Sequence, residues 1–180
     1  GCMRNFKTEG IIIKRRNYKD SDRVLTVLTK TGGKIYVRAT GVRKITSRRA
    51  GHIEPLNHSI LTLYQGNSFP VLTEAVTLDN FSVIKTDLRK VGIAYHLCEL
   101  VDGLCPENQE NGQVFSLLKS TLEKLSANCH PDQAECVEGS DLQSLVKRDS
   151  SASLGMTSKI IKDFEMQLLT ILGYWNNANY

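Results

Sequence analysis

RVLTVLTKTGGKIYVRAT, residues 23–40, is the stretch that decides the fold. Residues 23–29 are rich in Val, Leu and Thr, and Thr31-Gly32-Gly33 supplies a tight connection after them. In residues 34–40, Ile, Val and Ala alternate with Lys, Tyr and Arg, which is the period-two pattern of a half-buried strand. The stretch therefore predicts two successive β-strands joined by a short turn.

Three further segments carry strand signals on either side of this stretch. Residues 6–16 include the run Ile11-Ile12-Ile13, residues 58–65 alternate again, and residues 69–78 follow the turn residues Asn67-Ser68. Five short strands in about seventy residues predict a small closed barrel, because closure removes the exposed edges of a sheet.

From Asn80 onward the apolar period becomes helical, and helices are predicted over residues 80–105, 109–127 and 157–172, the last ending at Gly173. The stripe expected on the first helix is Phe81, Ile84, Leu88, Val91, Tyr95 and Cys98. The stripe expected on the second is Val114, Leu117, Leu118, Leu122 and Leu125.

Strands followed by helices predict an α+β protein, with a five-stranded barrel domain over residues 4–79 and an α-helical domain over residues 80–180. Residues 128–156 are polar and rich in Ser, Asp and Glu, a composition typical of a disordered connection. Their centre, residues 141–147, has the pattern of a helical turn or more.

The charge of the chain is strongly asymmetric. Residues 1–60 hold fourteen Lys and Arg against four acids, a net charge of +10, whereas residues 61–180 carry −6. Clustered cations repel one another unless a polyanion neutralises them, so the first third is expected to bind nucleic acid. A solvated basic face that only aids solubility is the alternative reading.

The candidate DNA-binding residues form two clusters and a pair. One cluster lies at the end of the first strand, one in the glycine-bracketed loop 41–51, and the pair on the outward face of the third strand: Lys14, Arg15, Arg16, Lys19; Arg43, Lys44, Arg48, Arg49; Lys34, Arg38. Candidate base-stacking residues are Tyr18, Tyr36 and Tyr64, for each of which packing against the core is an equal alternative.

Other functional classes find little support in the sequence. The five cysteines Cys2, Cys98, Cys105, Cys129 and Cys136 form no C-x-x-C pair, so we expect neither a disulfide framework nor a metal site. No nucleophile elbow or phosphate-binding Gly-Lys-Ser/Thr loop occurs, so we expect a non-enzymatic protein without a cofactor. No apolar run approaches 18 residues and the start lacks a signal peptide's apolar core, so a cytoplasmic protein without a membrane partner is expected.

Several short blocks follow one another along the chain in a specific order: EGIIIKRRNY at residues 9–18, SDRVLT at 21–26, GKI at 33–35, GVRK at 41–44, SR at 47–48, GHIEP at 51–55 and FEMQLLTILGY at 164–174. In order and spacing these blocks resemble the RecO family of bacterial DNA repair proteins. Family members usually continue well past the last block, and some carry a zinc-binding Cys cluster there, so this chain is expected to be either truncated or a short member.

The resemblance implies an oligonucleotide-binding (OB) barrel followed by a helical domain. It also implies a nucleoid-associated recombination mediator that binds single- and double-stranded DNA, anneals complementary strands and assists loading of the RecA recombinase. RecR and single-strand DNA-binding protein are the partners it implies. Two alternatives stay open on the residues alone: an RNA-binding OB module, and a protein-interaction scaffold that uses the helical domain.

Overall fold

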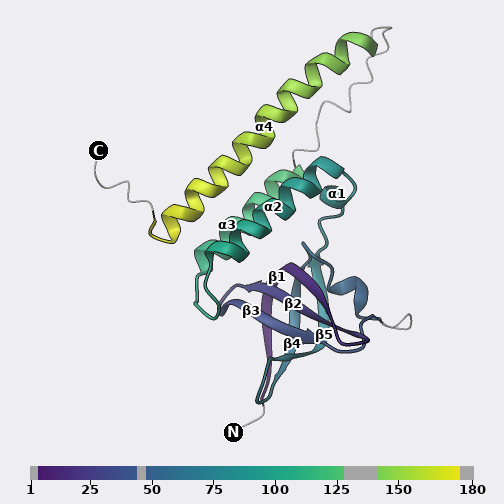
Figure 1. Ribbon diagram of the computed structural model, residues 1–180, viewed down its shortest axis with the longest axis vertical. Helices are drawn as coiled ribbons and strands as arrows, with labels where there is room; N and C mark the ends of the chain where they lie inside the picture. Colours follow the sequence, from purple (N-terminus) through teal and green to yellow (C-terminus); the bar gives the residue numbers. More distant parts are fainter. Residues whose placement is uncertain (1–3, 44–47, 128–141, 175–180) are drawn as a thin grey trace.

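The computed structural model describes residues 4–43, 48–127 and 142–174, with residues 142–154, 156 and 157 described through their backbone. Five strands precede four α-helices along the chain, and a short 3-10 helix, η1, lies between the third and fourth strands (Figure 1). Their bounds are β1 Arg4–Tyr18, β2 Asp22–Thr29, β3 Gly33–Ala39, η1 Ala50–His52, β4 His58–Gln65, β5 Val71–Asp79, α1 Ser82–Lys85, α2 Leu88–Leu104, α3 Gly112–Ala127 and α4 Leu142–Ile171.

The strands close into a barrel in the order β1-β2-β3-β5-β4, which confirms the predicted five-stranded barrel. The 15-residue β1 makes closure possible because it serves two neighbours. Its first half pairs antiparallel with β4, from Arg4 opposite Gln65 to Ile11 opposite His58. From Gly10 onward it pairs with β2, and the ring is completed where Arg38 of β3 lies parallel to Val71 of β5.

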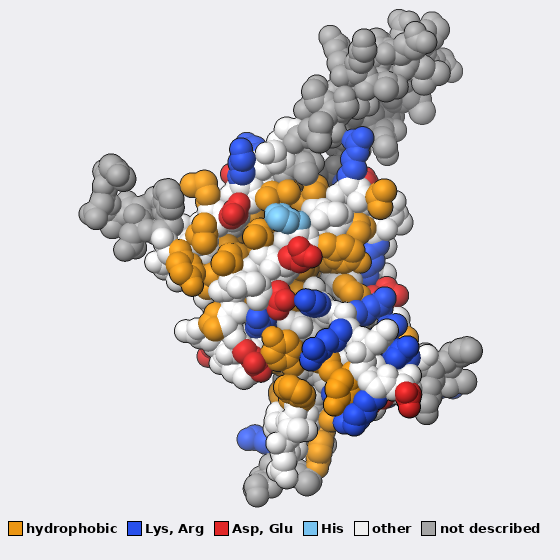
Figure 2. All heavy atoms as spheres, in the orientation of Figure 1, with side chains coloured by type: hydrophobic (Ala, Val, Ile, Leu, Met, Phe, Trp, Pro, Cys, Tyr) orange, Lys and Arg blue, Asp and Glu red, His pale blue; other side chains and the backbone are white. Residues whose placement is uncertain are grey.

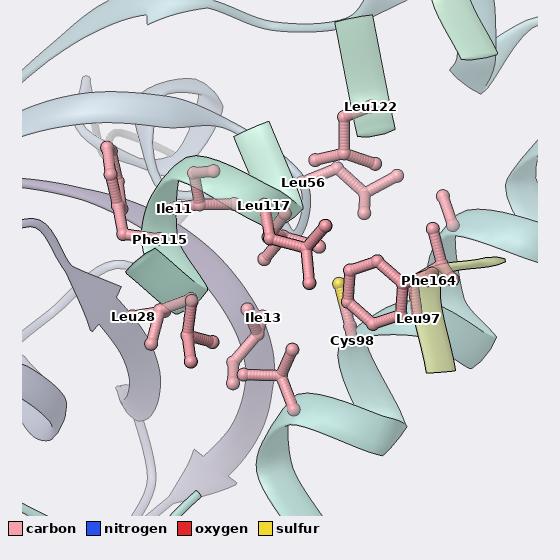
Figure 3. Packing of buried hydrophobic residues seen from close by; sticks show 14 of the residues in the cluster. Ile11, Ile13, Leu28, Leu56, Leu97, Cys98, Phe115, Leu117, Leu122 and Phe164 are labelled. Carbon is pink, nitrogen blue, oxygen red and sulfur yellow. The ribbon is translucent and has the colours of Figure 1, made fainter. Parts of the chain in front are cut away.

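The run Ile11-Ile12-Ile13 divides between two cores. The β1–β2 register shifts between Ile12 and Lys14, so Ile13 is the extra residue of a bulge. Ile12 packs inside the barrel with Leu25, while Ile11 and Ile13 join a cluster formed largely by the helices. Figure 3 shows the two outward isoleucines among side chains of the helical layer. Strand β1 thereby fastens the barrel to the helices.

The helices form a layer against one side of the barrel, with the long α4 lying beside α2 and α3 (Figure 1). The predicted stripe of α3 is buried throughout, and Phe164 and Leu168 of α4 complete the same core. At the end of α4, Gly173 has φ +83°, a left-handed conformation that suits glycine and stops the helix as predicted.

The stripe predicted for residues 80–105 is partly wrong because the segment is two helices. Asp87 caps α2, its carboxylate accepting hydrogen bonds from the backbone N–H of Arg89 (3.0 Å) and of Lys90 (3.4 Å). The break changes the helical phase, so Leu88 is 88% exposed and Tyr95 is 45% exposed. The buried residues of α2 are Ile93, Ala94, Leu97, Cys98 and Val101.

Part of the segment 128–156, for which a disordered connection was predicted, is helical, as the pattern at its centre indicated. Helix α4 begins at Leu142, fifteen residues before the predicted start at 157. Leu142, Leu145 and Val146 recur at three- and four-residue steps, a helical pattern that the polar composition around them obscures. Residues 128–141 lie outside the described residues.

Candidate nucleic-acid interface

Lys and Arg side chains gather over the barrel half of the face drawn in Figure 2. Four predicted cations follow one another where β1 runs out of the barrel: Lys14, Arg15, Arg16 and Lys19 are all exposed. Lys14 Nζ lies 3.7 Å from the carboxylate of Asp102 on α2. The lysine side chain is 62% exposed, so this ion pair is weak. The β1–β2 hairpin therefore presents a solvent-facing row of cations.

The loop after β3 is tied directly to this hairpin. The backbone N–H of Arg43 donates to the carbonyl of Ser21 at 3.0 Å, and its Nη1 donates to the carbonyl of Lys19 at 3.1 Å. The two predicted basic clusters therefore meet on one side of the barrel. Arg48 is exposed nearby in sequence, while Lys44 lies outside the described residues.

Arg23 is a cation of this surface that the sequence patterns did not single out. It has the same strand parity as Leu25 and Val27, which point into the barrel, and its Nε is buried without a hydrogen-bond partner among the described residues. Burial, followed by repulsion from Arg15 and Arg43, lowers the pKa of its guanidinium, and Glu54 offsets only part of this. Arg15 and Arg43 are thus near enough to Arg23 to repel its guanidinium.

Arg38 faces outward, as predicted, but its guanidinium is bound by the carboxylate of Asp22. Its Nε and Nη2 donate to Asp22 at 3.2 and 2.8 Å, and the Gly41 N–H donates to the other carboxylate oxygen at 2.9 Å. The Gly41 hydrogen bond and then Arg38 lower the pKa of Asp22. The guanidinium carbon also lies 5.5 Å from the ring centroid of Tyr18. Arg38 therefore braces the surface and leaves fewer donors for a ligand.

Two predicted cations lie elsewhere than expected. Lys34 does not lie on an open face: it is 6% exposed, and its Nζ donates to the Asp102 carbonyl at 2.7 Å. The outward side of β3 is covered there by α2, so this lysine joins the barrel to the helices. Arg49 donates to the carbonyls of Leu72 (2.9 Å) and Thr40 (2.7 Å), so it fastens its loop.

The three tyrosines do not form one platform. Tyr18 is 38% exposed, and its ring centroid lies 5.4 Å from Lys19 Nζ and 5.5 Å from the guanidinium carbon of Arg38. Tyr36 is half-buried and meets the ring of Phe69 edge to face, with centroids 6.2 Å apart. Tyr64 is half-buried on β4. Phe69 was not predicted, although an aromatic residue beside Pro70 in a strand connection was a visible signal.

The cysteines and acids gather nowhere as a metal site in the part of the chain that the structure describes. Cys98 and Cys105 are buried free thiols, and burial raises the pKa of Cys98 to about 12, which leaves it protonated and unreactive at neutral pH. Cys2, Cys129 and Cys136 lie outside the described residues. Every helix within residues 4–43, 48–127 and 142–174 is too short or too polar to span a bilayer.

Comparison with known proteins assigns the chain to a family. The family profile described as Recombination protein O N terminal matches residues 3–81, and Recombination protein O C terminal matches residues 85–137. DNA repair protein RecO of Roseiflexus sp. (strain RS-1) is 43% identical over 72% of this chain and 45% of its own length. DNA repair protein RecO of Dehalococcoides mccartyi (strain ATCC BAA-2100 / JCM 16839 / KCTC 5957 / BAV1) is 36% identical over 71% of this chain and 51% of its own.

The chain thus spans about half the length of these curated relatives. The first matched region covers the barrel and the second covers α2 and α3, whereas α4 lies outside both, and the barrel is the OB fold expected of the family's N-terminal part. The resemblance read from the sequence blocks is confirmed. This chain belongs to the RecO family of DNA repair and recombination proteins.

Proposed function

We propose that this chain is a non-enzymatic recombination mediator that binds single- and double-stranded DNA through its barrel and anneals complementary strands. The observation that carries the proposal is the convergence of Arg15, Arg23 and Arg43, with the buried Nε of Arg23 unpartnered among the described residues. A phosphate group supplies negative charge to offset the repulsion among these arginines, and its oxygens accept hydrogen bonds from guanidinium groups. We call Arg15, Arg16, Lys19, Arg23 and Arg43 the basic surface.

Annealing follows from the same electrostatics. Two complementary strands repel each other through their phosphates, and a surface that neutralises both lowers that repulsion while base pairing proceeds. Because phosphate contacts carry no base information, this surface binds with little sequence preference. No covalent step is needed, which is why the proposed role is non-enzymatic.

The test is fluorescence anisotropy of labelled single-stranded DNA with the triple variant Arg15→Gln, Arg23→Gln, Arg43→Gln. Removing three contacts lowers single-strand affinity about 100-fold at 0.1 M salt and makes the log–log salt slope shallower by about 2. The matched control removes three exposed cations of the helical layer: Lys124→Gln, Lys159→Gln, Lys162→Gln. Thermal unfolding followed by circular dichroism verifies that both variants remain folded.

Equal affinity and equal salt slope in the two triple variants would refute the assignment of the basic surface. Mixing the bound strand with its complement then measures annealing, which the triple Arg variant slows and the control does not. Competition between matched DNA and RNA oligonucleotides decides the RNA-binding alternative, since only RNA offers a 2′-hydroxyl. Preferential binding of RNA would replace the repair role with an RNA-binding one.

Assistance to RecA loading, and binding of RecR and of single-strand DNA-binding protein, are proposed from family membership. Sedimentation of the chain with each purified partner tests these contacts, and co-sedimentation is the expected result. Binding of the partners without DNA affinity would favour the interaction-scaffold alternative.

A further inference from the structure

A cavity of about 440 Å³ opens at the end of the barrel where β1 separates from β2. Its walls are the first half of β1, the turn between β2 and β3, and the loop between β4 and β5. A fourth wall comes from Glu107 and Asn108, in the connection between α2 and α3. The volume is within the range of small-molecule sites in proteins and is sufficient for one nucleobase with its sugar.

Aromatic side chains give this cavity a chemistry that the basic surface lacks. Phe69, on the β4–β5 loop, is 49% exposed, which leaves much of a large apolar ring in water. Tyr36 supports it edge to face at an interplanar angle of 68°, and Phe6 of β1 also lines the cavity. An exposed ring supported from behind is the arrangement on which an unpaired base stacks.

The loop that carries Phe69 is fixed on both sides of the ring. Gln65 Nε2 donates to the carbonyls of Gly66 (3.1 Å) and Ser68 (3.0 Å), and the Pro70 carbonyl accepts from the backbone N–H of Arg38 at 2.9 Å. The opposite wall is fixed where Asn108 N–H donates to the Lys34 carbonyl at 2.8 Å. Little conformational freedom is lost when a ligand enters such a preformed site.

Strand β3 links the cavity to the cationic side of the barrel. Tyr36 and Arg38 are two residues apart on one strand, so their side chains leave the same face about 7 Å apart. Arg38 contacts the ring of Tyr18, which follows the cations at the end of β1. A strand bound to the basic surface therefore reaches the cavity without leaving the barrel. Exposed Lys7 at its rim offers a cation for the neighbouring phosphate.

We propose that this cavity is a base-binding pocket that takes one unstacked base of a single-stranded nucleic acid, with Phe69 as the stacking platform. The inference rests on the proposed DNA binding and adds a preference to it. A duplex keeps its bases stacked and paired, so only a single strand fills the pocket. The basic surface provides general affinity, and the pocket makes the chain favour single strands.

The decisive probe is a pair of 12-nucleotide strands with the same number of phosphates, one of thymidines and one of abasic sites. Wild-type chain binds the thymidine strand about 5- to 150-fold more tightly than the abasic strand, the range expected for one stacked base. Phe69→Ala binds both strands with the abasic affinity, while its salt slope and duplex affinity stay unchanged. The matched control is Leu78→Ala, because Leu78 is a similarly exposed apolar residue, 50% exposed and absent from the cavity lining.

Each outcome separates the pocket from the basic surface. Equal preference for thymidine over abasic strands in Phe69→Ala and in wild type overturns the pocket while leaving DNA binding intact. A Phe69→Ala variant that loses single strand, abasic strand and duplex alike has a general binding defect, which also overturns it. Wild-type chain that binds neither strand overturns the pocket and the proposed function together.

Discussion

Gly33→Ala is expected to destabilise the chain severely, although it adds one methyl group to a turn. Gly33 has φ +70°, and a Cβ there would lie 2.1 Å from the Gln109 carbonyl oxygen and 2.6 Å from its carbonyl carbon. Both neighbours belong to backbone between α2 and α3, which no rotamer change can move. The substitution therefore pushes the helical layer away from the end of the barrel.

Three costs add up for this variant. The left-handed backbone costs an alanine about 1–2 kcal/mol. Overpacking against a fixed neighbour costs about 1–3 kcal/mol. Displacing Gln109 also strains the adjacent hydrogen bond from Asn108 N–H to the Lys34 carbonyl, which has a net value of about 1 kcal/mol. The expected loss is about 3–6 kcal/mol, a large part of the 5–15 kcal/mol by which a domain is stable.

Urea unfolding followed by far-ultraviolet circular dichroism measures this loss, and Gly51→Ala is the control because a Cβ at Gly51 meets nothing within 4 Å. Gly33→Asn separates the causes, since Asn tolerates positive φ but carries the same Cβ. An Asn variant as unstable as the Ala variant assigns the loss to the contact with Gln109. Gly33→Ala as stable as Gly51→Ala would refute the close approach of turn and helical connection.

Two further predictions concern charge and capping. Burial raises the pKa of Glu9, but the hydrogen bond with His58 at 2.7 Å and the charge of Lys30 outweigh it, so the pKa is lowered from 4.5. A carboxylate whose pKa is lower in the folded than in the unfolded chain stabilises the fold at any pH above the pKa of the unfolded chain, and this stabilisation is lost as the pH falls. Wild type should therefore lose free energy of unfolding below pH 4.5 more steeply than Glu9→Gln. Urea titrations at a series of pH values measure the difference. Asp87→Ala should lose about 1 kcal/mol, about 2–4 °C in Tm, while Asp87→Asn retains most of it; an unchanged Tm in the Ala variant contradicts the capping role.

The strands were predictable because their signal is local. Alternation in residues 34–40 and 58–65 fixes two strands without knowledge of the rest of the chain. The run Ile11-Ile12-Ile13 also predicted a strand, but three consecutive apolar residues do not show which side of the sheet each one faces. Pairing resolves this: Ile12 faces the barrel interior and its two neighbours face outward, and the bulge at Ile13 then changes the alternation for the residues that follow. That bulge depends on pairing with β2, which periodicity within β1 does not record.

The two helical errors have different causes. Leu88 and Tyr95 fitted a continuous period from Phe81, but the period restarts when Asp87 caps a new helix. A cap of this type was visible in the sequence as an acid before an apolar run. In α4 the helical pattern of Leu142, Leu145 and Val146 was visible, but the Ser- and Asp-rich composition around it obscured how far the helix extends. Composition over a window is a weaker guide than spacing.

The environments of the candidate cations were only partly predictable. Alternation along a strand predicts which face of the sheet a side chain lies on, but it does not predict which other parts of the chain cover that face. Lys34, Tyr36 and Arg38 all point outward from β3, yet each meets a different environment. Lys34 is covered by α2, Tyr36 lines the cavity, and Arg38 meets the carboxylate of Asp22. Arg23 shows the converse, since its parity is that of the barrel interior and yet its Nε has no hydrogen-bond partner among the described residues and Arg15 and Arg43 repel it.

The helical layer therefore determines which cations of the barrel are available to a polyanion. Ile11, Ile13 and Leu28 turn one outer side of the barrel apolar, and the helices bury that side. Lys34 lies at its margin and is neutralised by Asp102 of α2, whereas Arg15 and Arg43 lie beyond the cover. An isolated barrel would expose both groups of cations together with three large apolar side chains. The asymmetry that makes one side of this barrel a candidate DNA surface is thus a consequence of how β1 and β2 bind the helices.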